Sequence, residues 1–182
     1  MRETQPTALR GWFDASLDAE GRTGIGFVAT RENRVIATCA AVLESGQCCD
    51  SMAAEFAALD ALLRYLVTLE PTGPIVVRGD CATALVFAQG QRDAGECYQR
   101  HVARIMIARA LLPPVTFEWI QRAENVQADL LARDALRHYS TMNPQSRPAP
   151  PGRVPPKSRD RRRGAKIRRK ARQLLTRIID RL

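Results

Sequence analysis

Residues 24–69 read GIGFVATRENRVIATCAAVLESGQCCDSMAAEFAALDALLRYLVTL, and the spacing of the apolar side chains changes part of the way along this stretch. The first part holds two apolar runs typical of strands, at 24–30 and 34–43. The short link between them favours a tight hairpin. The second part has helical spacing, with apolar residues at Met52, Phe56, Leu59, Leu63 and Leu66. The stretch therefore predicts an antiparallel hairpin followed by a helix over 50–69, capped by Asp50 or Ser51.

The flanking segments extend this pattern into an α/β domain. LRGWFDAS at residues 9–16 predicts a strand before the hairpin, whereas PIVVRGD and VTFEWI predict two strands after it. Helices are expected at about 81–89 and 94–112, and over NVQADLLARDALRHY. Three strands with short links, followed by strand–helix alternation, predict a mixed sheet of five strands flanked by helices. Its first three strands would be antiparallel and its last two added in parallel.

The charge of the chain is divided between a body and a tail. The 182 residues include 28 Lys or Arg and 19 Asp or Glu, a net charge of +9. From Arg147 onward there are 14 basic residues and two acids, so the tail carries +12 and the body −3. Six prolines between 143 and 160 indicate an extended linker. We expect a globular domain over 1–142, a Pro-rich linker over 143–160 and a basic amphipathic helix over 161–182.

Several classes of protein are disfavoured. Charged residues interrupt every apolar stretch well before the ~20 residues that a membrane span needs. Residues 1–10 lack the apolar core of a secretory signal. The five cysteines are odd in number and include no C-x-x-C pair, so we expect reduced thiols rather than disulfides or a zinc site. These features indicate a cytoplasmic protein, and we expect a monomer.

Two carboxylates lie where apolar side chains are expected. Asp14 is inside an otherwise apolar strand and shares one strand face with Trp12 and Ser16. Glu55 shares the apolar stripe of the helix that begins near Asp50. A charge in such a place is unfavourable unless it has partners or a cation. The alternatives are a strand-end aspartate that faces water and a boundary glutamate stabilised by the helix N-terminus.

Two further carboxylates lie where α/β proteins place their sites. Asp80 follows a short buried strand, and the carboxyl ends of such strands commonly carry functional groups. Its alternative role is a helix N-cap. Asp129 lies one turn into the last helix of the body, in line with Ala132 and Leu136. The alternative there is an acid favoured by the helix dipole, and Asp134 is a second possible occupant of the site.

Together these four carboxylates would place several negative charges near one another, which requires cations. Hard oxygen ligands suit Mg²⁺ or Mn²⁺, which keep waters and accept phosphate oxygens as further ligands. Two such ions can activate water on one side of a phosphodiester and stabilise the leaving oxygen on the other. The combination therefore favours a metal-dependent reaction on nucleic acid.

Four segments resemble the ribonuclease H type 1 family and its reverse-transcriptase-associated relatives. They are FDAS with Asp14, MAAEFAALDALL with Glu55, VVRGDCATAL with Asp80, and ENVQADLLARDAL with Asp129. The last is the most specific, because the final helix of this family commonly opens with E-N-x-x-x-D-x-L-A. GIGFVAT also fits the family's glycine-containing second strand. The resemblance covers roughly residues 9–140.

The resemblance implies a five-stranded mixed sheet flanked by helices and endonucleolytic cleavage of the RNA strand of an RNA–DNA hybrid. It also implies two Mg²⁺ or Mn²⁺ ions as cofactors. By this likeness Asp14 would bridge the two ions, and Glu55, Asp80 and Asp129 would complete their coordination. All four residues would then be both catalytic and metal-binding.

The sequence departs from the family at the substrate contacts. Many members have a Thr-Asn-Asn-type run before the glutamate helix, where this chain has Asp50-Ser51-Met52. The loop QRAEN has Arg122 and lacks the mobile histidine of well-known bacterial members. Arg122 is a candidate contact to the scissile phosphate, with solvated surface as the alternative. A basic helical protrusion is also missing, and we expect the arginines of the 94–112 helix to form a solvated face. They are Arg100, Arg104 and Arg109.

The tail is the candidate replacement for that protrusion. Basic side chains neutralise phosphates and release counterions, which gives sequence-independent affinity. Its densest cluster comprises Arg159, Arg161, Arg162, Arg163, Lys166, Arg168, Arg169 and Lys170. Alternatively, the apolar stripe from Ile167 to Leu182 docks on the body or on a second copy. A third possibility is binding to an anionic membrane surface.

The leading hypothesis for function is a two-metal ribonuclease H that acts on RNA–DNA hybrids with water as nucleophile. The second is a non-catalytic nucleic-acid-binding module that keeps the fold, motivated by the missing asparagines. The third is an interaction domain whose basic helix recruits a protein partner. Retention of all four carboxylates favours the first, because a pure binder would gain from losing negative charge beside a phosphate backbone.

Overall fold

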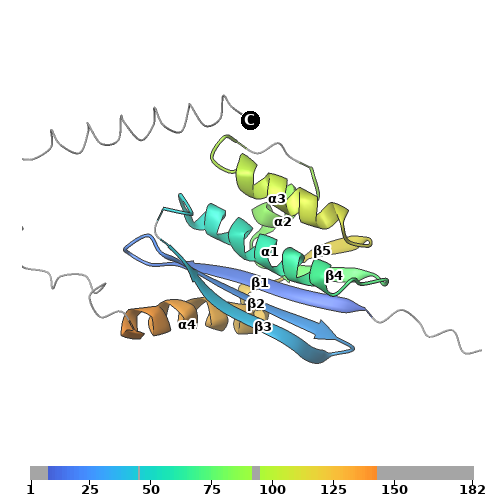
Figure 1. The fold of residues 1–182 in the computed structure, drawn as a ribbon, viewed down its shortest axis with the longest axis horizontal. Coiled ribbons are helices and arrows are strands. Elements are labelled where there is room, and N and C mark those ends of the chain that lie inside the picture. Colours follow the sequence, from blue (N-terminus) through green and yellow to red (C-terminus); the bar gives the residue numbers. More distant parts are fainter. Residues whose placement is uncertain (1–7, 45, 92–94, 143–182) are drawn as a thin grey trace, which may run out of the picture. The chain divides into compact units, whose positions relative to one another are not determined.

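The structure is a computed structural model of the chain that describes residues 8–44, 46–91 and 95–142 (Figure 1). Its elements are β1 (Leu9–Leu17), β2 (Thr23–Arg31), β3 (Arg34–Leu43), α1 (Ser51–Thr68), β4 (Ile75–Gly79), α2 (Ala82–Ala88), α3 (Gln99–Ala110), β5 (Val115–Trp119), the 3-10 helix η1 (Arg122–Glu124) and α4 (Val126–Met142). The linker over 143–160 and the basic helix over 161–182 lie outside the described residues.

The five strands form one mixed sheet in the order β3-β2-β1-β4-β5. β1 pairs antiparallel with β2, and β2 with β3, across the hairpin predicted from residues 24–43. β4 pairs in parallel with β1 on one side and with β5 on the other. The predicted topology is therefore confirmed, and it brings the end of β4 beside the middle of β1.

Helices cover both faces of this sheet. α1 packs over β1 and β2 with α3 beside it, whereas α4 lies on the opposite face (Figure 1). Most of the core is on the α1 side, where Phe13, Phe56 and Leu62 are completely buried. On the other face α4 approaches the sheet closely at two glycines of β2. A Cβ on Gly26 would lie 2.4 Å from the carbonyl oxygen of Ala128.

α1 begins where its N-cap satisfies the free backbone donors. The Asp50 side chain accepts a hydrogen bond from the backbone N–H of Ala53 and another from the Tyr98 hydroxyl, at 2.9 and 2.6 Å. Asp50 is therefore the cap, as one of the two predicted alternatives, and Ser51 is the first helical residue. The cap also links the start of α1 to the segment that precedes α3.

The prediction for the 94–112 helix was wrong at its start. α3 begins at Gln99, because Gly95 to Cys97 form a turn that ends at Tyr98. Two further observations concern the cysteines and the helices of the described part of the chain. All five cysteines are free thiols. No helix there combines the length and the apolar character that crossing a membrane requires.

Candidate active site

Asp14 lies in the middle of β1 and is only 3% exposed. Its Oδ1 accepts a hydrogen bond from the backbone N–H of Ala15 at 2.8 Å, whereas the ionised Oδ2 has no hydrogen-bond partner among the described residues. Burial, together with the nearby Asp80 carboxylate, raises the pKa of Asp14 to about 6. Asp14 is therefore not a strand-end aspartate facing water, and its carboxylate forms no ion pair among the described residues, although the charge of Arg122 opposes the rise in its pKa.

Glu55 projects from the second turn of α1 toward Asp14. Its Oε2 atom is buried, and in the ionised form this oxygen accepts no hydrogen bond from the described residues. Burial is the main cause that raises the pKa of Glu55 to about 9, and the charges of Asp14 and Asp80 add to it. The protonated form also donates a hydrogen bond to Asp14. If both carboxyls were ionised, their negative charges would repel. Without a cation, Glu55 and Asp14 therefore retain a proton between them at neutral pH.

Asp80 follows the last residue of β4, at the edge predicted to carry functional groups. It is not the N-cap of α2, because that position belongs to Cys81. Its Oδ1 accepts a hydrogen bond from the Asn125 side-chain amide at 3.0 Å. Its backbone carbonyl accepts one from the Trp119 indole N–H, also at 3.0 Å. Both contacts fix the turn at the end of β4.

Asn125 is a site residue to which the sequence analysis gave no role, although it belongs to the E-N-x-x-x-D pattern. It is 1% exposed, and its amide also donates to the carbonyl oxygen of Phe13 at 2.9 Å. A single side chain thus ties the residue before Asp14 to Asp80. The Asn125 Oδ1 is buried and has no partner among the described residues.

Asp129 is in the first turn of α4, and its charge acts on Asp14. Its Oδ1 lies 3.0 Å from Nη2 of Arg122 and 3.0 Å from Nη2 of Arg133. Arg122, on η1, is therefore an ion-pair partner of Asp129, and its side chain is still 68% exposed. Asp134 is turned elsewhere and pairs with Arg137 at 3.2 Å.

The structure brings Asp14 of β1, Glu55 of α1, Asp80 after β4 and Asp129 of α4 into one electrostatic cluster around Asp14. Among residues 8–44, 46–91 and 95–142, no group of three or more His, Cys, Asp or Glu side chains stands arranged to hold a metal ion. The cluster nevertheless fits divalent cations chemically. Two buried carboxylate oxygens without partners and two strongly raised pKa values are what a cation would relieve. The predicted nucleic-acid contacts from Arg159 to Lys170 lie outside the described residues.

Comparison with known proteins places the fold. A family model described as reverse transcriptase-like matches residues 13–135. A search of curated proteins finds no match. The structure of RNase H1 from the halophilic archaeon Halobacterium salinarum is 21% identical, with a TM-score of 0.64 over 72% of this chain and 98% of that chain.

Two other solved structures are similar to the same extent. The N-terminal RNase H domain of a Mycobacterium tuberculosis protein, solved as a fusion with maltose-binding protein, is 21% identical. Its TM-score is 0.67 over 75% of this chain and 98% of that chain. An RNase H1 isolated from compost, solved in complex with an RNA/DNA hybrid, is 22% identical. Its TM-score is 0.65 over 72% of this chain and 98% of that chain. At these identities the likenesses establish the fold.

Proposed function

This chain belongs to the reverse transcriptase-like family and has the ribonuclease H fold, and on that premise we propose that it is a metal-dependent endonuclease acting on the RNA strand of RNA–DNA hybrids. One observation carries the proposal. Asp14 is buried with the half-buried Glu55 beside it, and neither forms an ion pair among the described residues. The charge of Asp80 raises the pKa of both groups, and the charge of Asp129 raises that of Asp14. A protein that needed only stability would not keep these carboxylates there.

The proposed metal ligands are Asp14, Glu55, Asp80 and Asp129, with Mg²⁺ or Mn²⁺ as the ions. Bound divalent cations at such a site lower the pKa of water and stabilise the charge that develops on the leaving oxygen. Asp14 interacts with Glu55, Asp80 and Asp129, so it is the candidate for a ligand that two ions would share. Removal of the proton held by Glu55 and Asp14 must accompany metal binding, because the ligand form of a carboxyl is the ionised one.

Other residues position the cluster and meet the substrate. Asn125 fixes Asp80 against β1 through its two hydrogen bonds. Arg122 is exposed beside the cluster and already contacts Asp129, so it can reach a phosphate at the rim. The exposed surface at Arg122 therefore supports its assignment as a phosphate contact. The tail cluster from Arg159 to Lys170 is proposed to add affinity through phosphate neutralisation.

The hybrid is the proposed substrate because structures with this fold include an RNase H1 bound to an RNA/DNA hybrid. A foamy viral protease-reverse transcriptase, 11% identical, has also been solved with such a hybrid, at a TM-score of 0.56. The second candidate is a non-catalytic nucleic-acid-binding module. It is favoured by one observation: Asp50, at the position of the family's Thr-Asn-Asn-type run, is committed to capping α1 and to Tyr98.

One experiment separates the two candidates. The full chain is incubated with end-labelled RNA–DNA hybrid, RNA duplex, DNA duplex and single strands, in Mg²⁺, Mn²⁺ or chelator. We expect shortened RNA with intact DNA, in the hybrid alone, and no product with chelator. Cleavage of all substrates would support nuclease activity but contradict a preference for the hybrid. Tight binding with no product in either metal would favour the non-catalytic module.

A further inference from the structure

A groove between α1 and α3 lies outside the proposed active site. It consists of two adjoining cavities, of about 640 and 280 Å³, that share Asp60, Arg64 and Arg104. The larger cavity reaches the end of β3 at Leu43, and the smaller reaches the C-terminal end of α3 at Leu111. We call this combined surface the α1–α3 groove. Its volume is in the range of sites that hold part of a ligand or a peptide.

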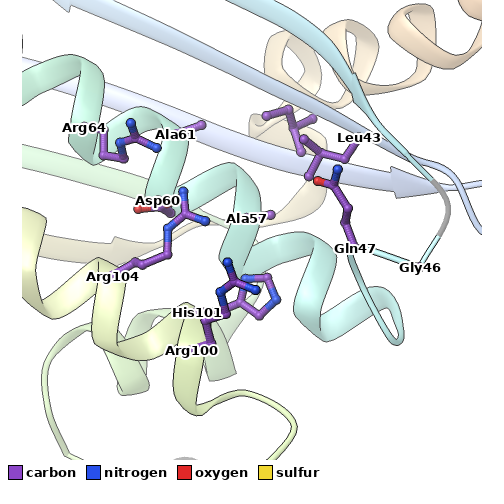
Figure 2. Close-up of a pocket in the computed structure, with 11 residues that line it drawn as sticks. Leu43, Gly46, Gln47, Ala57, Asp60, Ala61, Arg64, Arg100, His101 and Arg104 are labelled. Atoms are coloured by element: carbon purple, nitrogen blue, oxygen red, sulfur yellow. Dashed lines mark ion pairs between the residues drawn. The ribbon is translucent and has the colours of Figure 1, made fainter. Parts of the chain in front are cut away.

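The larger cavity is lined by three arginines and by apolar side chains that include Ile25 and Leu43. Figure 2 shows Arg64 from α1 and Arg100 and Arg104 from α3 around this cavity, with His101 beside them. Asp60, 5% exposed, is the acid of the cavity and is paired with Arg104 at 2.6 Å. The expectation that the α3 arginines only form a solvated face is therefore wrong for Arg104, and also for Arg109, whose guanidinium donates a hydrogen bond to the carbonyl oxygen of Ala88 at 3.0 Å. Two arginines remain beyond that pair, so the cavity is positively charged.

Apart from the three charged residues that it shares with the larger cavity, the smaller cavity is lined by apolar side chains. Val67 and Ala108 form its base, and Ile107 and Leu111 stand at its edge with 64% and 67% of their surfaces exposed. Two large apolar side chains exposed on successive turns of one helix face leave a surface that a partner could cover. Because this surface continues directly into the arginines, one ligand can contact both parts.

The groove is directed away from the carboxylate cluster. Glu55 and the groove residues lie on the same helix, α1. At about 100° per residue, Asp60 is roughly 140° and Arg64 roughly 180° around the helix axis from Glu55. A strand bound at the carboxylates is therefore on the opposite side of α1 from these arginines. The groove is therefore a surface separate from the carboxylate cluster.

We propose that the α1–α3 groove docks an acidic peptide segment of a partner protein, with carboxylates on Arg64 and Arg100 and apolar side chains against Ile107 and Leu111. Charge complementarity selects this occupant. The chain's own tail carries +12 from Arg147 onward, so charge disfavours it as the occupant of an arginine-lined groove. A nucleic-acid backbone satisfies the arginines but leaves Ile107 and Leu111 without an apolar partner.

The test uses the full chain and a fluorescein-labelled peptide in which pairs of Glu and Leu alternate. The basic tail also attracts acidic peptides, so groove variants decide the result. Arg64→Gln with Arg100→Glu, and separately Ile107→Ser with Leu111→Ser, are compared with Arg34→Glu and Val35→Ser on the exposed edge of β3. We expect both groove pairs to weaken anisotropy-detected binding by about tenfold or more, and the β3 controls to leave it unchanged.

Several results would overturn the proposal. One is equal affinity in wild type and both groove pairs, which would assign peptide binding to the tail. A second is undiminished binding when the Leu residues of the peptide are replaced by Ser. A third is a matching loss of affinity for an RNA–DNA hybrid in the arginine pair, which would make the groove a nucleic-acid surface. Thermal melting of each variant checks that the exposed substitutions leave the fold intact.

Discussion

The buried side-chain amide of Asn125 donates one hydrogen bond to Oδ1 of Asp80, at 3.0 Å, and its second to the carbonyl oxygen of Phe13. This contact holds one proposed metal ligand in register with the strand that carries another. We expect Asn125→Ala to raise the Mg²⁺ concentration for half-maximal cleavage by roughly 10–100-fold, as for other residues that orient ligands. Titrations of activity against Mg²⁺ measure the shift.

The matching variant Asn125→Asp separates positioning from packing. It keeps the volume but removes both amide N–H donors, so the packing is retained while the hydrogen bonds to Asp80 and Phe13 are lost, and we expect the Mg²⁺ requirement to rise as in Asn125→Ala. If both variants lower the melting temperature but leave the Mg²⁺ dependence unchanged, Asn125 serves only the fold.

The Asp14→Asn variant should abolish Mg²⁺-dependent cleavage and yet stabilise the protein in chelator. The substitution replaces a buried carboxyl group, whose pKa is raised to about 6, by an uncharged amide. We expect a gain of roughly 1–3 kcal/mol in the free energy of unfolding at neutral pH or above. Denaturant titration measures the gain, and the hybrid assay measures the loss. Asp134→Asn, an acid of the same domain that pairs with Arg137 instead, is the control and should leave activity unchanged. Full activity in Asp14→Asn would contradict the assignment of Asp14 as a metal ligand.

The positions of the four carboxylates were predictable because Asp14, Glu55 and Asp129 lie in elements with a clear periodicity, and Asp80 directly follows a short apolar strand. The role of Asn125 was not, because its two partners, Asp80 and Phe13, are 45 and 112 residues away along the chain. The start of α3 was missed for a similar reason. The turn before it is tied to Asp50 through Tyr98, a contact that no local pattern contains. The features that the sequence did not predict therefore depend on hydrogen bonds between residues far apart along the chain.

Stability without metal should fall as pH rises. The folded-state pKa of Glu55 is raised to about 9 and that of Asp14 to about 6, both above their ordinary values. Between about pH 5 and about pH 9 the folded protein holds protons that the unfolded chain has released, so its stability decreases across this window. Thermal melts in chelator should show the decline. Glu55→Gln should flatten most of it, since an amide does not titrate.

Mg²⁺ should reverse this trend, because it binds the ionised carboxylates. We expect the increase in melting temperature on adding Mg²⁺ to be larger at about pH 9 than at about pH 5. An increase that is the same at both pH values would contradict the assignment of the raised pKa values to the metal site.

The close approach of α4 to β2 should be needed for both stability and cleavage. Gly26 pairs with Asp14 in the sheet, and a Cβ there would lie 2.4 Å from the carbonyl oxygen of Ala128, the residue before Asp129. Gly26→Ala must therefore displace α4, at a cost of roughly 1–3 kcal/mol in stability. Because Asp129 moves with the helix, we expect a loss of activity at temperatures where the variant remains folded. Gly95→Ala, whose Cβ meets no atom within 4 Å, is the control and should change stability by about 0.5 kcal/mol or less.

Neutralising the tail should weaken substrate binding without removing the chemistry. The variant replaces its eight densest basic residues by Gln in the full-length chain. They are Arg159, Arg161, Arg162, Arg163, Lys166, Arg168, Arg169 and Lys170. Each lost phosphate contact removes counterion release, so the slope of log affinity against log salt concentration should become shallower and KM should rise at moderate salt. The rate at saturating hybrid should stay close to that of the wild type, because Asp14, Glu55, Asp80 and Asp129 are untouched. An unchanged salt slope would show that the tail does not bind nucleic acid. The alternative role, docking through its apolar stripe, would then be favoured.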